Sequence, residues 1–221
     1  MNGEALIAAF RQRADDTALP PFYAEADVFR WASEAEAEAC IRGKLLYDTT
    51  SSFLSIAVVA AQGVYALDSR IDRIDKISFT PTGGRAFDLR TVGIDWIHDQ
   101  CDWATRTGRP EVAAYTNGRL TVWPTPSTTG TGTLNLSAFR FPLNTIDSNS
   151  DEPEIAREHH AALVDWMLFL AYTTKDGETE DSPRAAKHEA LFTEKFGERP
   201  DADMLRRHRE KRRVVTRYGG Y

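Results

Sequence analysis

The sequence predicts a mixed α+β fold in which a helical bundle, formed by the N- and C-terminal helices, carries an inserted small antiparallel β domain. Three observations support this prediction. Apolar residues recur at helical spacing near both ends, short apolar and β-branched runs fill the middle, and turn pairs such as Asn117-Gly118 separate those runs. We expect a helical domain from residues 1–50 and 151–204, a β domain from 51–150, and a basic C-terminal tail from 205–221.

Two helices are expected before the β domain. Apolar residues at helical spacing predict a short amphipathic helix over Gly3–Ala14: Leu6, Ile7 and Phe10. The consecutive Pro20 and Pro21 end it, because proline cannot continue a helix. A longer helix is expected at about 24–47, with a mostly small apolar face: Val28, Ala32, Ala35, Ala39 and Leu46. Its opposite face carries polar residues: Glu34, Glu36, Glu38 and Arg42.

The pattern changes to that of strands after Asp48. Phe53–Ala60 and Val64–Leu67 are apolar runs separated by a Gln-Gly turn, and together they predict a β-hairpin. Ile71–Thr80 alternates apolar and polar residues, which predicts another strand. Thr91–Ala104 is compatible with a short helix or with an irregular crossing.

Three further strands are expected at Val112–Thr116, Arg119–Trp123 and Thr133–Phe141. Asn117-Gly118 separates the first two, and this pair is a strong hairpin signal because both residue types tolerate the positive φ of a type I′ turn. The loop Ser127–Gly132 is small, polar and rich in Thr and Gly, so we expect either disorder or a contact at its tip.

Helices return near the C-terminus. Asn144–Asp151 is expected to be a polar linker. Glu154–Thr174 is the strongest predicted helix, with Pro153 just before it, and apolar residues cover so much of its circumference that we expect it to be buried. A further amphipathic helix is expected over Arg184–Phe196 and is ended by Gly197.

The charge of the chain is unevenly distributed. The net charge is −6, yet residues 205–221 hold seven basic side chains and one acidic one, which leaves −12 for residues 1–204. Such a tail fits contact with DNA or docking on an acidic partner, and a solvated terminus is the alternative. The apolar residues among the cations favour a segment that orders on binding. The candidate docking residues are Arg206, Arg207, Arg209, Lys211, Arg212, Arg213, Val214, Val215, Arg217, Tyr218 and Tyr221.

The sequence contains no recognisable catalytic motif. A Gly-rich phosphate loop, a nucleophile elbow and an HExxH zinc motif are all absent. His159-His160 suit a metal poorly, because neighbouring helical residues point about 100° apart. A solvated face or a helix cap explains Asp95, Asp99 and Asp102 better than a cation site does. We therefore predict a protein that is not an enzyme and that uses no cofactor and no metal.

Membrane insertion and secretion are not expected. No apolar run approaches the roughly 20 residues that a membrane span needs. The N-terminus lacks a basic region ahead of an apolar stretch, so we expect no signal peptide. Cys40 and Cys101 are far apart, which favours reduced thiols.

Six sequence blocks follow one another over nearly the whole chain. They are Leu6–Phe10 with Asp16, Tyr23 and the helix Val28–Ala39; Val58–Leu67 with Gly63 and Tyr65; Trp103–Tyr115 with Thr107-Gly108-Arg109-Pro110; Leu120–Pro126; Leu134–Pro142; and His160–Tyr172 with the helix that ends at Phe196. Each block alone is a weak signal, but their order and spacing are more specific. With its six blocks in this order, the chain resembles the adaptor (head–tail connector) proteins of tailed bacteriophages.

This resemblance implies a structural virion protein that is made in the host cytoplasm and located in the neck of the particle. It implies a dodecameric ring under the portal protein that extends the channel for double-stranded DNA toward the next tail or neck protein, without a cofactor. We expect the basic tail to dock on the portal, and the acidic segment Glu34–Glu38 to meet a neighbouring copy or to line the channel. The alternative is a small nucleic-acid-binding protein that uses the basic tail, against which the acidic body argues.

Overall fold

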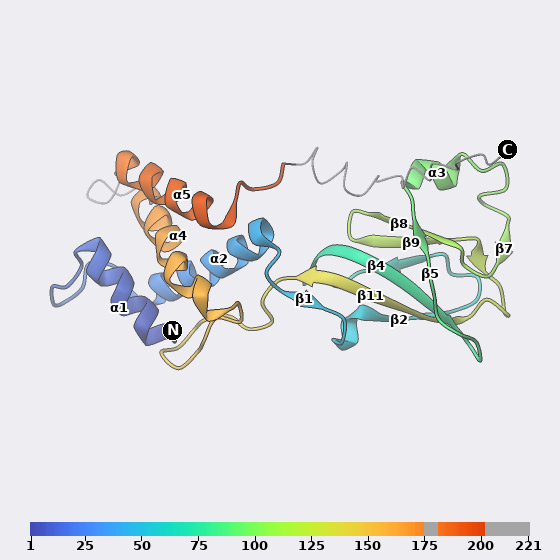
Figure 1. The fold of residues 1–221 in the computed structure, drawn as a ribbon, viewed down its shortest axis with the longest axis horizontal. Helices are drawn as coiled ribbons and strands as arrows, with labels where there is room; N and C mark the ends of the chain where they lie inside the picture. The colour runs from blue at the N-terminus through green and yellow to red at the C-terminus, as the bar shows by residue number, and fades with distance from the viewer. Residues whose placement is uncertain (175–180, 202–221) are drawn as a thin grey trace, which may run out of the picture. The chain divides into compact units, whose positions relative to one another are not determined.

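A computed structural model of the chain describes residues 1–174 and 181–201. They form helices and small, mainly antiparallel sheets, so the predicted mixed α+β class is confirmed (Figure 1). The chain divides into two compact units, and each is described by itself. The helical unit comprises Met1–Tyr47 and Phe139–Pro200, and the β unit contains Asp48–Ala138.

The described part of the helical unit contains α1 (Gly3–Ala14), α2 (Glu25–Gly43), the 3-10 turn η2 (Arg157–His159), α4 (His160–Thr173) and α5 (Ser182–Phe196). Side-chain caps begin two of these helices. Asn2 accepts a hydrogen bond of 3.1 Å from the first turn of α1, and Asp181 accepts one of 3.0 Å from the first turn of α5. At the end of α2, Lys44 adopts a left-handed conformation (φ 52°), and its N–H donates to the Cys40 carbonyl.

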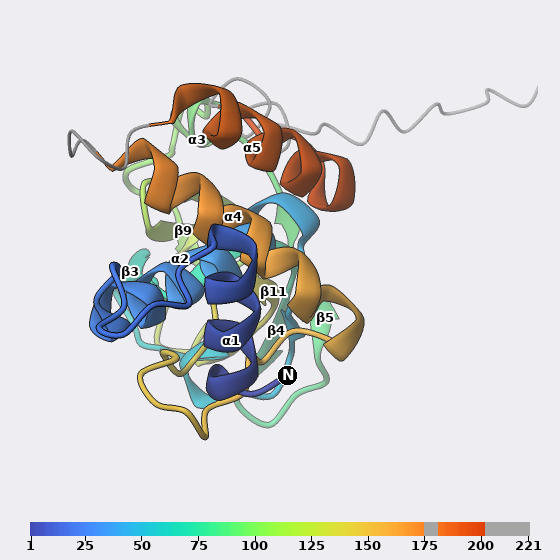
Figure 2. The same cartoon turned by 90° about the vertical axis from the view of Figure 1, so that its left-hand side faces the viewer.

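Helix α4 is central to this unit, because it packs against α1, α2 and α5 (Figure 2). The expected burial of this helix is confirmed by its fully buried residues: Leu163, Val164, Met167, Leu168 and Ala171. The predicted small-residue face of α2 is buried as well: Val28, Ala32, Ala35 and Ala39. Alanine side chains on this face allow neighbouring helices to approach closely.

The predicted start of the helix at Glu154 is wrong, because α4 begins only at His160 after the turn η2. The backbone N–H groups of Glu154 and Ile155 both donate to the carboxylate of Glu36 on α2, the second at 3.1 Å. A side chain of another helix therefore takes donors that a first helical turn would leave without intrahelical partners. Ile155 nevertheless keeps its side chain in the core.

The described residues form three sheets, whose strands belong to the β unit except for Tyr47 of the first strand and the last two residues of β11. The first has the order β1-β11-β4-β5, with β2 also pairing β11; its strands are β1 (Tyr47–Asp48), β2 (Ser55–Val58), β4 (Ile71–Pro81), β5 (Phe87–Asp88) and β11 (Gly132–Arg140). The second has the order β3-β9-β8-β6, with β3 (Val64–Ala66), β6 (Arg90–Thr91), β8 (Val112–Thr116) and β9 (Arg119–Trp123). The third is the parallel pair of β7 (Thr107–Gly108) and β10 (Thr125–Pro126), and a 3-10 turn η1 (Ser52–Leu54) precedes β2.

The two larger sheets bury one shared apolar cluster, which includes Val58, Tyr65, Ile77, Phe79, Leu120, Val122, Leu134 and Leu136. A short helix, α3 (Ile94–His98), forms in the segment for which the sequence left helix and irregular crossing open. Its Ile97 packs in a second cluster with Val112 and Trp123, which point to the other face of β8 and β9.

The hairpin predicted from Asn117-Gly118 is confirmed. Strands β8 and β9 pair antiparallel with Thr116 opposite Arg119, so two residues form the loop. Asn117 (φ 50°) and Gly118 (φ 71°) both have the positive φ that a type I′ turn requires.

The hairpin predicted from the runs Phe53–Ala60 and Val64–Leu67 is wrong. Strand β2 pairs with β11, with Val58 opposite Gly132, whereas β3 pairs with β9, with Val64 opposite Thr121. The connection therefore passes from one sheet to the other instead of turning back within one sheet. Ala61 in this connection has φ 63°, and its N–H donates to the carbonyl of Pro126 at 2.8 Å.

Candidate assembly surfaces

The candidate docking residues of the basic tail fall outside the described residues: Arg206, Arg207, Arg209, Lys211, Arg212, Arg213, Val214, Val215, Arg217, Tyr218 and Tyr221. The geometry that bears on assembly therefore comes from the exposed surfaces of the helical unit and of the β unit, each taken separately.

The loop between α1 and α2 is organised around one buried carboxylate. Asp16 is 6% exposed, and its two oxygens accept hydrogen bonds from the N–H groups of Phe22 (2.6 Å) and Tyr23 (3.3 Å). Arg11 forms an ion pair with it at 2.6 Å and also donates to the Tyr23 carbonyl at 3.3 Å. These bonds close a short loop on itself. Asp16 and Tyr23 are both residues of the first of the six sequence blocks.

This ordered loop presents apolar side chains to solvent. Leu19 is 93% exposed and Phe22 is 53% exposed, while Tyr23 turns inward against the rings of Phe10 and Trp31. Holding an apolar tip in one conformation lowers the entropy that a contact would otherwise lose on binding. The loop is therefore suited to contact another protein.

Replacing Asp16 with Ala tests how far this loop depends on its carboxylate. We expect Asp16→Ala to lower the free energy of unfolding by about 2 kcal/mol, because two backbone donors and a partly buried guanidinium lose their acceptor. Urea denaturation followed by circular dichroism measures this change. Asp27→Ala, which removes a half-exposed carboxylate, is the control, and equal losses in the two variants would contradict the role assigned to Asp16.

The expectation that Glu34–Glu38 faces a neighbouring copy or the channel as an acidic surface is wrong for two of its three acids. Glu36 is 1% exposed and Glu38 is 6% exposed. Glu36 accepts the two backbone hydrogen bonds ahead of α4, and Glu38 pairs with Arg42 at 2.8 Å. Of the three, Glu34 alone is exposed, with 47% of its side chain accessible, so the other two acids mainly hold the helical unit together.

Arg42 ties α2 to the C-terminal half of α5. Its side chain is 5% exposed, and its guanidinium lies 4.7 Å from the Trp166 ring centroid and 5.2 Å from that of Phe192. It donates to Glu38 at 2.8 Å and to the Thr193 hydroxyl at 2.9 Å. Arg42 therefore adds a link between α2 and α5, whose main packing is against α4, and the basic segment follows α5 in the sequence.

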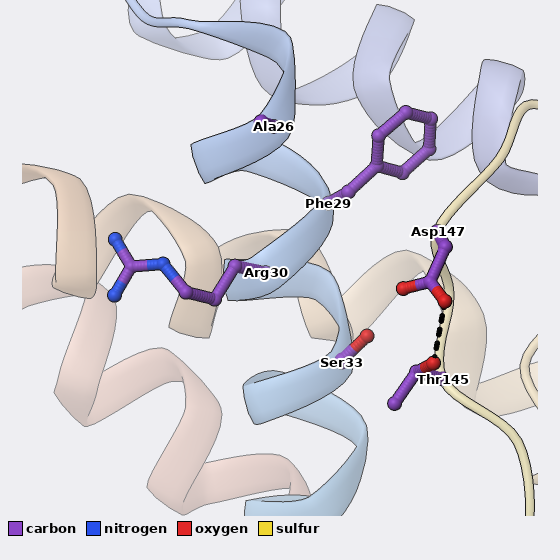
Figure 3. Close-up of a pocket in the computed structure, with 6 residues that line it drawn as sticks. All are labelled: Ala26, Phe29, Arg30, Ser33, Thr145 and Asp147. Carbon is purple, nitrogen blue, oxygen red and sulfur yellow. Dashed lines mark hydrogen bonds between the residues drawn. The ribbon is translucent and has the colours of Figure 1, made fainter.

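The segment expected to be a polar linker lies against α2. Ile146 in it is 2% exposed, its N–H donates to the Ser33 hydroxyl at 2.9 Å, and that hydroxyl lies 3.3 Å from the Ile146 carbonyl. A shallow groove of about 290 Å³ remains beside this contact, as Figure 3 shows. Its residues are Ala26, Phe29, Arg30, Ser33, Thr145 and Asp147.

The β unit exposes a second set of large side chains. Val59, Val64 and Trp103 are each nearly half exposed. Guanidinium groups lie over aromatic rings at four places: Arg70 on Phe53, Arg90 on Trp96, Arg106 on Trp123, and Arg109 on Phe87. Arginine and tryptophan are over-represented at protein interfaces. The rings of these pairs are partly or fully buried, Trp123 being only 5% exposed, so the exposed Val59, Val64 and Trp103 are the better candidates for contact with another protein.

The loop Ser127–Gly132 is held by backbone hydrogen bonds. The N–H of Ser127 donates to the Gly108 carbonyl at 3.0 Å, and the Thr131 carbonyl accepts from Thr82 at 3.0 Å. Of the two expectations for this loop, a contact at an ordered tip fits these bonds, whereas disorder does not.

The weak metal candidates do not converge in the described residues. The Nε2 atom of His160 lies 2.9 Å from the Ile155 carbonyl, whereas the His159 ring lies against Phe196. Asp102 lies 4.0 Å from Arg106. Across the part of the chain that the structure describes, no three His, Cys, Asp or Glu side chains are grouped as metal ligands would be. A search of the same residues finds no helix with the length and apolar character to span a membrane.

Comparison with known proteins gives one family. The model of the family described as SU10 adaptor protein matches residues 1–217, which includes both units and most of the basic tail. No curated protein matches the chain.

Proposed function

From the premise that this chain belongs to the SU10 adaptor protein family, a family of phage head-to-tail adaptors, we propose that it assembles as a ring under the portal protein. The membership makes the chain a structural component of the virion. The ring, proposed to be a dodecamer, extends the DNA channel from the portal toward the next tail or neck protein. The family match over residues 1–217 is the observation that carries this proposal.

The surfaces of both units support an assembly role. A closed ring needs two different surfaces on each copy, because each copy meets its neighbours head to tail. The helical unit offers the apolar tip of the α1–α2 loop, and the β unit offers its exposed side chains Val59, Val64 and Trp103. The partner-facing role of the basic tail rests on its composition, seven cations interleaved with apolar and aromatic residues.

Removing Leu205–Tyr221 tests the proposed portal docking. We expect the truncated chain to keep its circular dichroism spectrum and its unfolding midpoint, yet to lose co-sedimentation with the portal. A matched full-length variant carries Gln at the seven basic positions and keeps Val214, Val215, Tyr218 and Tyr221, which separates charge from apolar contact. Co-assembly of the truncated chain at the wild-type level would overturn the docking role of the tail.

The alternative function, nucleic-acid binding through the same tail, predicts a different result. The free chain would shift duplex DNA in a gel at low salt, and the affinity would fall steeply as salt rises, because phosphate contacts release counterions. The charge of −12 on residues 1–204 opposes such binding. A gel shift that vanishes in the truncated chain, together with unchanged portal binding, would favour this alternative.

A further inference from the structure

A polar pocket of about 490 Å³ lies between the α1–α2 loop and the adjoining ends of α4 and α5. All the residues that line it belong to the helical unit. Those that carry charge or a hydroxyl group are Asp15, Asp16, Tyr23, Tyr172, Asp181 and Arg184. The polar part of the lining is therefore mostly carboxylate and phenol groups with one guanidinium, and Ala14, Ala18, Pro20 and Phe22 supply the apolar part.

The charges of this pocket are only partly compensated. Asp16 pairs with Arg11 at 2.6 Å, and Asp181 pairs with Arg184 at 3.2 Å. Asp15 ends α1 in a left-handed conformation (φ 58°) and has no ion-pair partner among the described residues. One carboxylate at the pocket thus remains free to accept a cation.

Two tyrosine hydroxyls add acceptors to this carboxylate. Tyr172 is only 5% exposed and lines the pocket, and within the described part of the chain neither its hydroxyl nor that of Tyr23 has a hydrogen-bond partner. Burial raises the pKa of Tyr23, and the nearby Tyr172 and Asp16 raise it further, so the phenol stays neutral. The Tyr172 ring already has the Arg184 guanidinium 5.8 Å from its centroid. Because that ring already has a cation beside it, the groups left for an incoming guanidinium are the phenol oxygens and the carboxylate of Asp15.

We infer that this pocket binds an arginine side chain from the basic segment Leu205–Tyr221 of a second copy of the chain. The segment carries +6 and the preceding residues carry −12, so the two are complementary in charge. Twenty residues follow Asp201, and an extended chain of that length spans up to about 66 Å, enough to reach an adjoining copy. A pocket on one copy and a segment on the next make a head-to-tail contact that can close into a ring.

This inference goes beyond the proposed function, in which the same segment docks on the portal. It predicts that copies self-associate when the portal is absent and that the portal then competes for the segment. Both contacts are electrostatic, so both weaken as salt rises.

The test is sedimentation velocity of the full-length chain at low and high salt, with the double variant Asp15→Asn and Tyr172→Phe. Asn tolerates the left-handed conformation of position 15, and Phe removes only a hydroxyl. We expect self-association at low salt and a dissociation constant raised at least about tenfold in the double variant, which corresponds to the loss of a charge-assisted contact. Glu189→Gln, which removes an exposed carboxylate away from the pocket, is the control and should not change the constant.

The source of the bound segment is tested separately. A photo-reactive benzoylphenylalanine replaces Tyr172, and two populations with different tags are mixed before irradiation. Cross-links from position 172 to the basic segment of the other population support the inference, whereas cross-links within one copy overturn it. Equal self-association of the wild type, the double variant and a chain without Leu205–Tyr221 also overturns it, as does a wild type that stays monomeric. Portal co-sedimentation of the double variant, measured in parallel, reports on the proposed function independently.

Discussion

Arg42→Ala is expected to destabilise the helical unit by about 3–5 kcal/mol, because it leaves a buried carboxylate without its main partner. Glu38 has a side chain that is only 7% exposed, and its remaining partner, Arg199, lies at 3.7 Å and is itself 65% exposed. The substitution also removes the guanidinium from between the rings of Trp166 and Phe192. Urea denaturation of the full chain, followed by tryptophan fluorescence and circular dichroism, measures the loss.

Arg30→Ala is the matched control for this substitution. Arg30 lies on the same helix and pairs with Asp27 and Glu34, but its side chain is 60% exposed, so its removal should cost less than about 1 kcal/mol. The double variant Arg42→Met and Glu38→Met should recover part of the lost stability, because it removes both charges together. Equal effects at Arg42 and Arg30, or no recovery in the double variant, would contradict the buried-pair explanation.

The loss of stability in Arg42→Ala should be accompanied by weaker binding to the portal if the tail docks there as proposed. Arg42 donates to Thr193 and also lies within 3.4 Å of the Gly197 carbonyl, at the end of α5. Losing these two contacts would hold the C-terminal end of α5 less firmly, and the basic segment follows that end in the sequence. Arg42→Lys keeps the charge but loses the planar fork, so its stability and its portal binding should both fall between those of the wild type and of Arg42→Ala.

Local signals predicted the elements whose partners are close in sequence. The bounds of α1 agree with the expected Gly3–Ala14, since its apolar spacing and the Pro20-Pro21 break are both local. The β8–β9 hairpin also depends on adjacent residues, Asn117 and Gly118. The pairing of β2 with β11 joins residues more than seventy positions apart, and no signal within the Phe53–Leu67 segment distinguishes it from a hairpin.

The expected polar face of α2 is wrong for Glu36, Glu38 and Arg42, whose side chains are buried, and the spacing of two of them could have shown this from the sequence. Arg42 follows Ala35 by seven residues and Val28 by fourteen, so it lies on the apolar face of the helix. Glu36 follows Ala32 by four residues and flanks that face in the same way. A helical projection therefore indicates that these side chains face the core. It does not identify their partners, because those come from α5 and from the residues ahead of α4.

Glu36→Leu is expected to lower the free energy of unfolding by about 2–4 kcal/mol, because it leaves the N–H groups of Glu154 and Ile155 without an acceptor in a buried position. Glu36→Gln keeps one carbonyl oxygen in the same place and should cost less. Chemical denaturation of the two variants and of the wild type measures the difference. If Leu and Gln proved equally mild, the carboxylate would not be what holds the segment ahead of α4.

The same carboxylate gives the helical unit a pH dependence whose sign follows from its environment. Burial raises the pKa of Glu36 above its usual 4.5, although the hydrogen bonds from Ile155 and Glu154 oppose the shift. The Glu36 carboxyl therefore stays protonated to a higher pH in the folded chain than in the unfolded chain. The stability that this protonated carboxyl contributes is complete below pH 4.5 and is lost as the pH rises through the folded pKa. Glu36→Gln does not titrate, so its stability relative to the wild type should improve as pH rises through that window.

Denaturation of both proteins between pH 4 and pH 7.5 measures this difference, and Glu34→Gln, on the exposed side of the same helix, should show no such trend. A difference that stays constant with pH, or that changes in the opposite direction, would mean that the backbone hydrogen bonds outweigh burial at Glu36. In that case the two N–H groups would stabilise the charged carboxylate, and acid would weaken the contact between α2 and the residues ahead of α4.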